Sequence, residues 1–188
     1  MNTLIYVAVL LIVFGLLSFL LLLLVIVVDS VVRGHDLPTS RRVTKSIVKI
    51  IFEYRAARNF YDLGCAYGAL AIRVKRKFPT LSVHAIDNNP IRITLAKIRA
   101  LGGRRNIQFV HRNIFDVNLN DADIVYSYLS YDLMPLLENK LQKELKRGAI
   151  VITNTSHFST WKPIQKIVTY PKISKMPDFE TLFVYQKM

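Results

Sequence analysis

The stretch YDLGCAYGAL, residues 61–70, contains residue types that could bind a nucleotide-like ligand. Small residues stand at positions 64, 66 and 68, which allows a tight turn and a close approach to a ligand. The helix expected after this turn would offer unpaired N–H groups. No Gly-Lys-Ser/Thr follows, which excludes a phosphate-binding P-loop, and Ala66 with Ala69 fits the dinucleotide fingerprint only loosely.

Two further polar residues end the next predicted strands. Asp87 closes SVHAID about twenty residues after the turn, where a carboxylate can accept hydrogen bonds from both hydroxyl groups of a ribose. NAD and S-adenosylmethionine both carry such a ribose, and the alternative is that Asp87 caps the next helix. Asn113, in HRNIFD, could offer its amide to an adenine, or it could form a turn.

The elements that must position these residues alternate between strands and helices. NFYDL, SVHAID, NIQFVH, DIVYSYL and AIVITNT are typical of strands, and the first helix of the series is expected to begin near Ser40. A later helix, stopped by Gly148, is expected to carry a leucine stripe at Leu133, Leu136, Leu137, Leu141 and Leu145. The pattern predicts an α/β fold with a Rossmann-like, doubly wound, seven-stranded sheet, in which a terminal strand pair closes five parallel strands. Ligands of such sheets lie at the carboxyl ends of the strands.

The apolar start of the chain predicts one N-terminal transmembrane helix over residues 4–28. This segment has no charged residue, and at about 1.5 Å per residue it could span a hydrocarbon core of roughly 30 Å. A cleaved signal peptide is the alternative, but no basic residue precedes the run and no small-x-small site follows it. We expect residues 29–39 to form a juxtamembrane linker and residues 40–188 to form the globular domain.

Charge indicates orientation and partners. Arg33, Arg41 and Arg42 follow the apolar segment and no Lys or Arg precedes it, so the C-terminal domain is expected on the cytoplasmic side of a membrane, or on an organelle's equivalent. The net charge of +13 suits anionic lipid headgroups. Nucleic acid is the less favoured partner, because no basic cluster is interleaved with aromatic residues. The lone Cys65 excludes an intrachain disulfide, and no metal site is predicted.

The motifs YDLGCAYG, AIDNNP, RNIFD, ADIVYSYL and LKRGAIVI, in this order, resemble the class I (seven-β-strand) S-adenosylmethionine-dependent methyltransferases. The resemblance covers about residues 40–185. It implies S-adenosyl-L-methionine as the cofactor, with Asp62, Gly64 and Gly68 around its methionine part, Asp87 on its ribose and Asn113 near its adenine. The cofactor-binding set expected from it is Asp62, Gly64, Cys65, Ala66, Gly68, Asp87, Asn88 and Asn113. Two positions depart from the family: Ala66 replaces the middle glycine, and Asn113 replaces the usual acid.

Four further features are similar to a narrower group, the small membrane-anchored protein-lysine methyltransferases of mitochondria and their prokaryotic relatives. They are the apolar segment, LPTS after it, the stretch from YLSYDL to STWKP, and the final ETLFVY. This resemblance implies methylation of a lysine in a membrane protein such as the ATP synthase c subunit or the ADP/ATP carrier.

A lysine must lose its proton before it attacks a methyl group, so an aromatic pocket with oxygen acceptors is expected. The candidate catalytic residues are Tyr128, Tyr131, Asp132 and Trp161, whereas Tyr126 is expected to be a core residue. The Asn/Asp-Pro-Pro-Tyr/Phe motif of amide and adenine methyltransferases is absent, which argues against a planar nitrogen as acceptor. The alternatives are a small-molecule or lipid methyltransferase, an RNA methyltransferase, and a non-catalytic cofactor-binding module at the membrane. The sequence does not indicate an oligomeric state.

Overall fold

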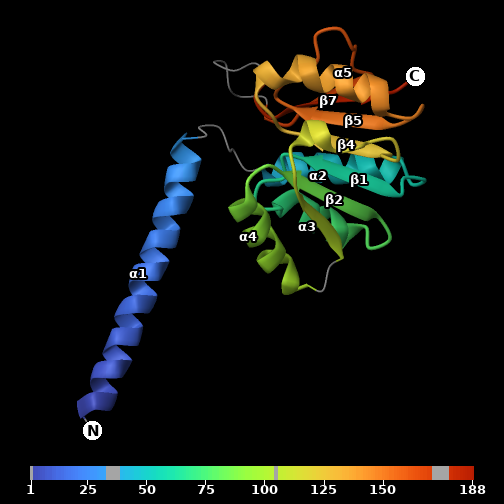
Figure 1. Cartoon of the computed structure of the whole chain (residues 1–188). Coiled ribbons are helices and arrows are strands. Elements are labelled where there is room, and N and C mark those ends of the chain that lie inside the picture. Colours follow the sequence, from blue (N-terminus) through green and yellow to red (C-terminus); the bar gives the residue numbers. More distant parts are fainter. Residues whose placement is uncertain (1, 33–38, 104–105, 171–177) are drawn as a thin grey trace. The chain divides into compact units, whose positions relative to one another are not determined.

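The computed structural model describes residues 2–32, 39–103, 106–170 and 178–188, and it divides into two units, residues 1–37 and 38–188 (Figure 1). The first unit is the single helix α1 (Asn2–Val32). Within Thr3–Val25, an 18-residue stretch has a mean hydropathy of 3.2, and none of its residues is buried. By length and composition this helix could cross a membrane, and a signal sequence meets the same test. Most of the expected linker, residues 33–38, lies outside the described residues.

The second unit alternates helices and strands, as predicted. Its helices are α2 (Arg41–Glu53), α3 (Ala69–Lys77), α4 (Pro90–Leu101) and α5 (Met134–Glu144), with the 3-10 turns η1 (Ile114–Asp116) and η2 (Tyr131–Leu133). Its strands are β1 (Asn59–Leu63), β2 (Ser82–Asp87), β3 (Ile107–His111), β4 (Ile124–Ser127), β5 (Ile150–Asn154), β6 (Gln165–Val168) and β7 (Thr181–Gln186).

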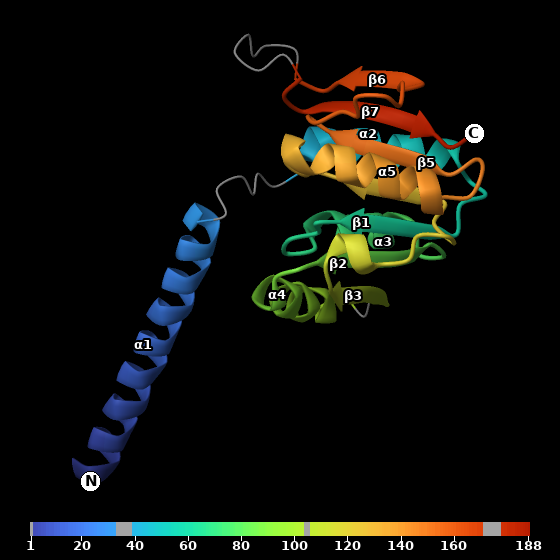
Figure 2. The ribbon, with the colours of Figure 1, turned by 45° about the horizontal axis from the view of Figure 1, so that its top comes forward.

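The seven strands form one sheet in the order β3-β2-β1-β4-β5-β7-β6, with β3 and β6 at its two edges (Figure 2). Strands β1 to β5 run parallel, β7 pairs antiparallel with β5, and β6 pairs antiparallel with β7. This arrangement confirms the predicted fold. The chain proceeds outward from β1 to β3 and then returns to place β4 on the other side of β1. The strand order therefore reverses between β1 and β4, where ligands of such sheets bind.

The two faces of the sheet bury separate clusters of apolar side chains. One face is covered by α2, α3 and α4, through Val43, Ile47, Ile50, Ile51, Leu70, Ala71, Val74 and Ile93. The other is covered by α5 and η1, through Ile114, Met134, Leu137 and Leu141. Strand residues therefore alternate between the two clusters: Phe60 and Tyr126 face α2, whereas Tyr61 and Val125 face α5.

The helix ends agree with the sequence in part. Ser40 is the N-cap of α2, and its Oγ accepts a hydrogen bond from the Val43 amide at 3.3 Å, which confirms the expected start. The prediction that Leu136 belongs to a buried leucine stripe was wrong, because this side chain is 60% exposed. Gly148 was also wrong as the stop of α5, because the helix ends at Glu144 with Leu145 as its C-cap. Gly148 has a φ of 85° and lies in the turn that follows.

Gly68 joins the turn after β1 to α3, and close packing leaves no room for a side chain at this position. It is the N-cap of α3 with a φ of 70°. A Cβ atom there would lie 2.7 Å from Cε1 of Phe109 and 3.0 Å from Cβ of Ala96. Glycine is therefore needed so that α3 can begin against β3 and α4.

We predict that Gly68→Ala lowers the free energy of unfolding by about 2–4 kcal/mol, because it adds left-handed backbone strain to a steric clash. Chemical denaturation of the full chain in a neutral detergent would measure this. Gly102→Ala is the matched control, because Gly102 has a φ of −61° and a Cβ there would meet no atom within 4 Å. Equal losses in the two variants would contradict the packing argument.

Candidate active site

The turn after β1 is held in place by the backbone of β2. The amides of Gly64 and Cys65 both donate to the carbonyl oxygen of Ile86 at 2.9 Å, and the amide of Gly68 donates to the carbonyl oxygen of Cys65 at 2.9 Å. Ala66 lies at the top of the turn with a φ of 47°, in the left-handed region. The alanine at this position therefore occupies a conformation that glycine adopts at less cost.

Asp87 braces the same turn from the end of β2. Its Oδ2 accepts a hydrogen bond from the Ala66 amide at 2.9 Å, and its Oδ1 accepts one from the Asn89 amide at 2.9 Å. The helix cap is Asn89, whose Oδ1 accepts from the amides of Ile91 and Arg92, so the alternative in which Asp87 caps α4 is wrong. A carboxylate oxygen has two acceptor sites, so each oxygen of Asp87 could also accept a ribose hydroxyl. Asn88, beside it, is exposed.

Asp62 lies in β1 on the α2 face and is 2% exposed. Its Oδ2 is buried, and within the described residues it has no hydrogen-bond partner. Burial, followed by the charge of Asp87, raises the pKa of Asp62 to about 7, while hydrogen bonding by the Ala71 amide lowers it. The protonated carboxyl group therefore favours the folded state. This contribution is complete below the unfolded pKa of 3.8 and is lost as pH rises through about 7.

These residues fit S-adenosylmethionine. The cofactor carries a cationic ammonium group that could pair with the open oxygen of Asp62, and a ribose that could bind to Asp87. At Gly64, with a φ of 79°, a Cβ would lie 2.8 Å from Cδ2 of Leu129, so the Leu129 side chain would have to shift and the left-handed backbone would be strained. Burial, followed by the charges of Asp62 and Asp87, raises the pKa of the Cys65 thiol, which therefore stays protonated.

Asn113 follows β3 and forms a turn. It is exposed, and its Oδ1 accepts a hydrogen bond from the Phe115 amide at 3.1 Å as the N-cap of η1. This is the turn-forming alternative foreseen from the sequence. The amide nitrogen of Asn113 remains the group that could contact an adenine.

A buried polar group lies beyond Asp62 at the carboxyl ends of β4 and β5. Tyr126 is paired in register with Asp62 and is 2% exposed. Its hydroxyl lies 3.1 Å from Oγ1 of Thr39 and 3.5 Å from Nδ2 of Asn154. Tyr126 is thus a core residue, as expected, and it also fastens the segment before α2 to the sheet. Burial raises the pKa of its hydroxyl, which stays protonated.

Strained backbone lies after β5 and before β7. Thr155 has a φ of 66° and Glu180 a φ of 48°, and the Glu180 amide donates to Oγ1 of Thr155 at 3.2 Å. A left-handed conformation is uncommon for a β-branched residue such as threonine, and strained positions of this kind cluster at functional sites. Neither residue was singled out from the sequence, because the motif TNTS gives no signal of strain.

Both predicted catalytic tyrosines interact with this strained segment. Burial raises the pKa of the half-buried Tyr128, while hydrogen bonding to Thr155 lowers it and the negative charge of Glu180 raises it. Tyr131 is 52% exposed, and its hydroxyl donates to the carbonyl oxygen of Thr155 at 2.8 Å. The sequence thus identified the two tyrosines that interact with Thr155, but it did not identify Thr155 itself.

The other two predicted catalytic residues lie elsewhere. Asp132 is exposed in η2. Trp161 packs in an aromatic cluster on the α5 face, with ring centroids 5.6 Å from Phe158 and 5.4 Å from Tyr185. The buried carboxylate of Glu138 holds the segment around Trp161, because it accepts hydrogen bonds from the amides of residues 159–161. These contacts give Trp161 a packing role, and its catalytic role stays a prediction.

Residues 62–165, more than half of the chain, match a family described as the ANTKMT methyltransferase domain. A protein-lysine N-methyltransferase of Saccharolobus islandicus (strain REY15A) is 29% identical over 132 residues, which is 69% of this chain and 81% of that protein. The adenine nucleotide translocase lysine N-methyltransferase of Mus musculus is 32% identical over 78 residues, which is 40% of this chain and 34% of the mouse protein.

Solved structures share the fold. An RNA methyltransferase from Salinibacter ruber in complex with S-adenosyl-L-homocysteine has a TM-score of 0.66 at 20% identity, covering 80% of this chain and 93% of the other. At this identity the similarity shows the fold alone. Together with the match to the family, it confirms the resemblance that the motifs indicated. The chain belongs to the ANTKMT methyltransferase domain family and is a class I S-adenosylmethionine-dependent methyltransferase.

Proposed function

We propose that this methyltransferase acts on a lysine side chain of a membrane protein and that α1 anchors it in the membrane. Residues 4–28 would be the membrane span, residues 29–39 the linker, and residues 40–188 the catalytic domain on the cytoplasmic side or its organelle equivalent. Two relatives are named as lysine methyltransferases, and the name of the mouse protein includes a translocase as the substrate, which supports this choice. The apolar composition of α1 supports the anchor.

One observation carries the catalytic part of the proposal. Oδ2 of Asp62 is buried, has no hydrogen-bond partner among the described residues, and belongs to the strand before the turn that Asp87 braces. A buried carboxylate oxygen without a hydrogen-bond partner is costly, and a cationic ligand would remove that cost. We assign Asp62 to the ammonium group of the cofactor, Asp87 to its ribose, and the backbone of Gly64, Cys65, Ala66 and Gly68 to the turn around it. Asn88 and Asn113 would border the adenine side.

The bound cofactor supplies an electrophilic methyl group on a sulfonium. The residues of the chain must hold the amine in line with this group after its proton has left. Glu180 would attract the cationic side chain of the substrate, and the hydroxyl of Tyr128 would accept a hydrogen bond from the amine and orient its lone pair. Tyr131 and Asp132 would border the entrance. Because burial keeps Tyr126 protonated, its hydroxyl orders the neighbouring loop and does not act as a base.

We predict that the full chain transfers labelled methyl groups from S-adenosylmethionine into the protein of a membrane fraction, and that mass spectrometry finds them on lysine. Asp62→Asn should lower this transfer by at least about tenfold, since it removes the charge that pairs with the cofactor. This variant is preferable to a change at Asp87, because losing Asp87 would also release the Ala66 amide. If the label were found in extracted lipid or in RNA, that molecule and not a lysine would be the methyl acceptor. Cofactor binding without transfer to any fraction would indicate a binding module.

We predict that the affinity for S-adenosylmethionine rises with pH between about pH 6 and about pH 7.5. Asp62 has a pKa of about 7 and must lose its proton before it pairs with a cation, so binding at pH 6 should be roughly tenfold weaker than with the carboxylate fully ionised. Calorimetry across this range would measure the effect. In Asp62→Asn the slope should disappear. The same slope in both proteins would show that another group titrates.

Two tyrosine variants separate a catalytic role from a structural one. Tyr128→Phe should lower the rate of methyl transfer by about tenfold or more, with unchanged cofactor affinity, because it removes the group that orients the amine. Tyr126→Phe should instead lower the free energy of unfolding by about 1 kcal/mol, because Thr39 and Asn154 lose their shared partner. Steady-state kinetics, calorimetry and denaturation would test both. A fully active Tyr128→Phe variant would remove this residue from the mechanism.

A further inference from the structure

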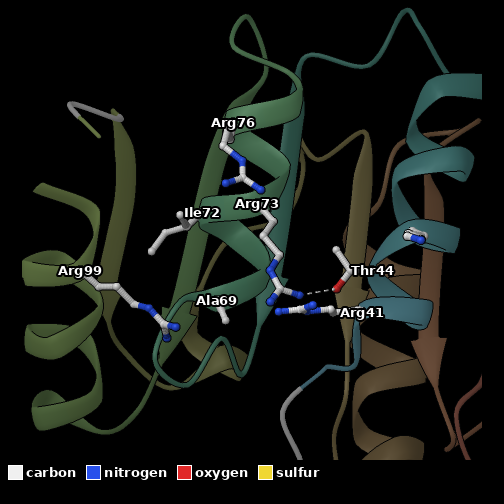
Figure 3. A pocket seen from close by; sticks show the side chains of 8 residues that line it. Arg41, Thr44, Ala69, Ile72, Arg73, Arg76 and Arg99 are labelled. Atoms are coloured by element: carbon white, nitrogen blue, oxygen red, sulfur yellow. Dashed lines mark hydrogen bonds between the residues drawn. The ribbon is translucent and has the colours of Figure 1, made fainter. Parts of the chain in front are cut away.

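An open, basic cavity of about 470 Å³ lies between α2, α3 and α4 (Figure 3). Five of the side chains that line it are cationic: Arg41, Lys45, Arg73, Arg76 and Arg99. None of the described residues that line it is acidic. It shares no residue with the cofactor turn. On α3, the lining residues at positions 69, 72, 73 and 76 occupy the side opposite to Leu70, Ala71 and Val74, which are buried against the sheet. The cavity therefore opens away from the sheet, and Ala69, the first residue of α3, is the lining residue that follows the cofactor turn in the chain.

The cations of this cavity are not neutralised by any carboxylate of the described residues. Within the part of the chain that the structure describes, none of the five forms an ion pair with a carboxylate. Arg41 and Arg73 extend toward one another between α2 and α3 (Figure 3). Neighbouring like charges repel, and an anion placed between them would relieve that repulsion.

One of the arginines is held in position. Nη1 of Arg73 donates to Oγ1 of Thr44 at 3.3 Å, and the Thr44 hydroxyl in turn donates to the carbonyl oxygen of Ser40 at 2.8 Å. Thr44 is 7% exposed, so this support is fixed by the packing of α2. A positioned guanidinium group loses less freedom when it binds a phosphate, and its planar fork can make two parallel hydrogen bonds to phosphate oxygens.

We propose that this cavity binds the phosphate headgroups of an anionic membrane, and so holds the catalytic domain against the lipid surface. The proposal rests on the proposed function, because it takes α1 as a membrane helix. In the sequence, Arg41 begins α2 nine residues after Val32 ends α1, so an anchored α1 would tether the start of α2 to the membrane. A lipid fits better than RNA, since none of the described residues that line the cavity is an aromatic on which a base could stack.

The test is calorimetry on the full chain in a neutral detergent. The titrants are dihexanoyl-phosphatidylglycerol, dihexanoyl-phosphatidylcholine, inorganic phosphate and a short single-stranded RNA. We expect phosphatidylglycerol to bind at least about tenfold more tightly than phosphatidylcholine, with weaker binding of inorganic phosphate and RNA. Tighter binding of inorganic phosphate would identify a soluble anion as the ligand, and tighter binding of RNA would identify nucleic acid. Either result would overturn the membrane proposal.

Matched variants distinguish a built site from net charge. Arg41→Gln with Arg73→Gln should weaken binding of phosphatidylglycerol roughly 25-fold, since each cation near an anionic headgroup contributes about fivefold. Lys143→Gln with Arg147→Gln removes the same charge from exposed positions in and after α5 and should change binding little. Equal losses in both pairs would overturn the site. If the arginine pair fails to fold, the exposed Arg99→Gln should still cost about fivefold, and no loss there would equally overturn it.

The outcome for the cavity is independent of the enzyme assay. Both variant pairs should keep the cofactor affinity of the unmodified chain, because neither touches the turn after β1. Loss of lipid binding with intact methyl transfer in detergent would support the cavity proposal. Absence of methyl transfer by the unmodified chain, with its lipid binding intact, would count against the proposed enzymatic function alone.

Discussion

The site depends on the carboxylate of Asp87, which bridges the amides of Ala66 and Asn89. Through the first bond it fixes the turn after β1, and through the second it fixes the residue that caps α4. Both bonds are made to a carboxylate, and the bond to Asn89 is buried, where such bonds are stronger than in water. The turn, the end of β2 and the start of α4 are therefore positioned together. The same charge raises the pKa of Asp62, so the group that shapes the turn also holds part of its neighbour in the protonated form near neutral pH.

The parallel sheet brings these residues together. The end of β1 lies between the ends of β2 and β4, so the cofactor turn lies beside Asp87 on one side and the loop after β4 on the other. Leu129 in that loop approaches Gly64, and Gly68 lies against Phe109 and Ala96. The glycines thus serve the packing of the protein itself as well as any ligand. Their positions are constrained from several elements at once, and a side chain at either would disturb more than the turn.

The basic cavity and the proposed cofactor site lie differently with respect to the sheet. The residues proposed to bind the cofactor lie at the carboxyl ends of the strands, whereas the cavity lies on the outer surfaces of α2, α3 and α4. The start of α2 serves both regions. Thr39, directly before its cap, contacts Tyr126 at the end of β4, and Thr44, one turn into the helix, supports Arg73.

The sequence by itself determined the α/β class, the five parallel strands closed by a terminal strand pair, the turn after β1 and the two acidic residues beside it. These features follow from local patterns: hydrophobic periodicity, small residues in a turn, and residues that end strands. Only the tertiary structure decided that Asp87 braces the Ala66 amide, that Asn89 caps α4, and that Trp161 packs beside Phe158 and Tyr185. It also placed the strained Thr155 and Glu180 beside Tyr128, and gathered five cations from three helices into one cavity. These arrangements join residues that are distant in sequence, and the choice of hydrogen-bond partner depends on which atoms packing brings within reach.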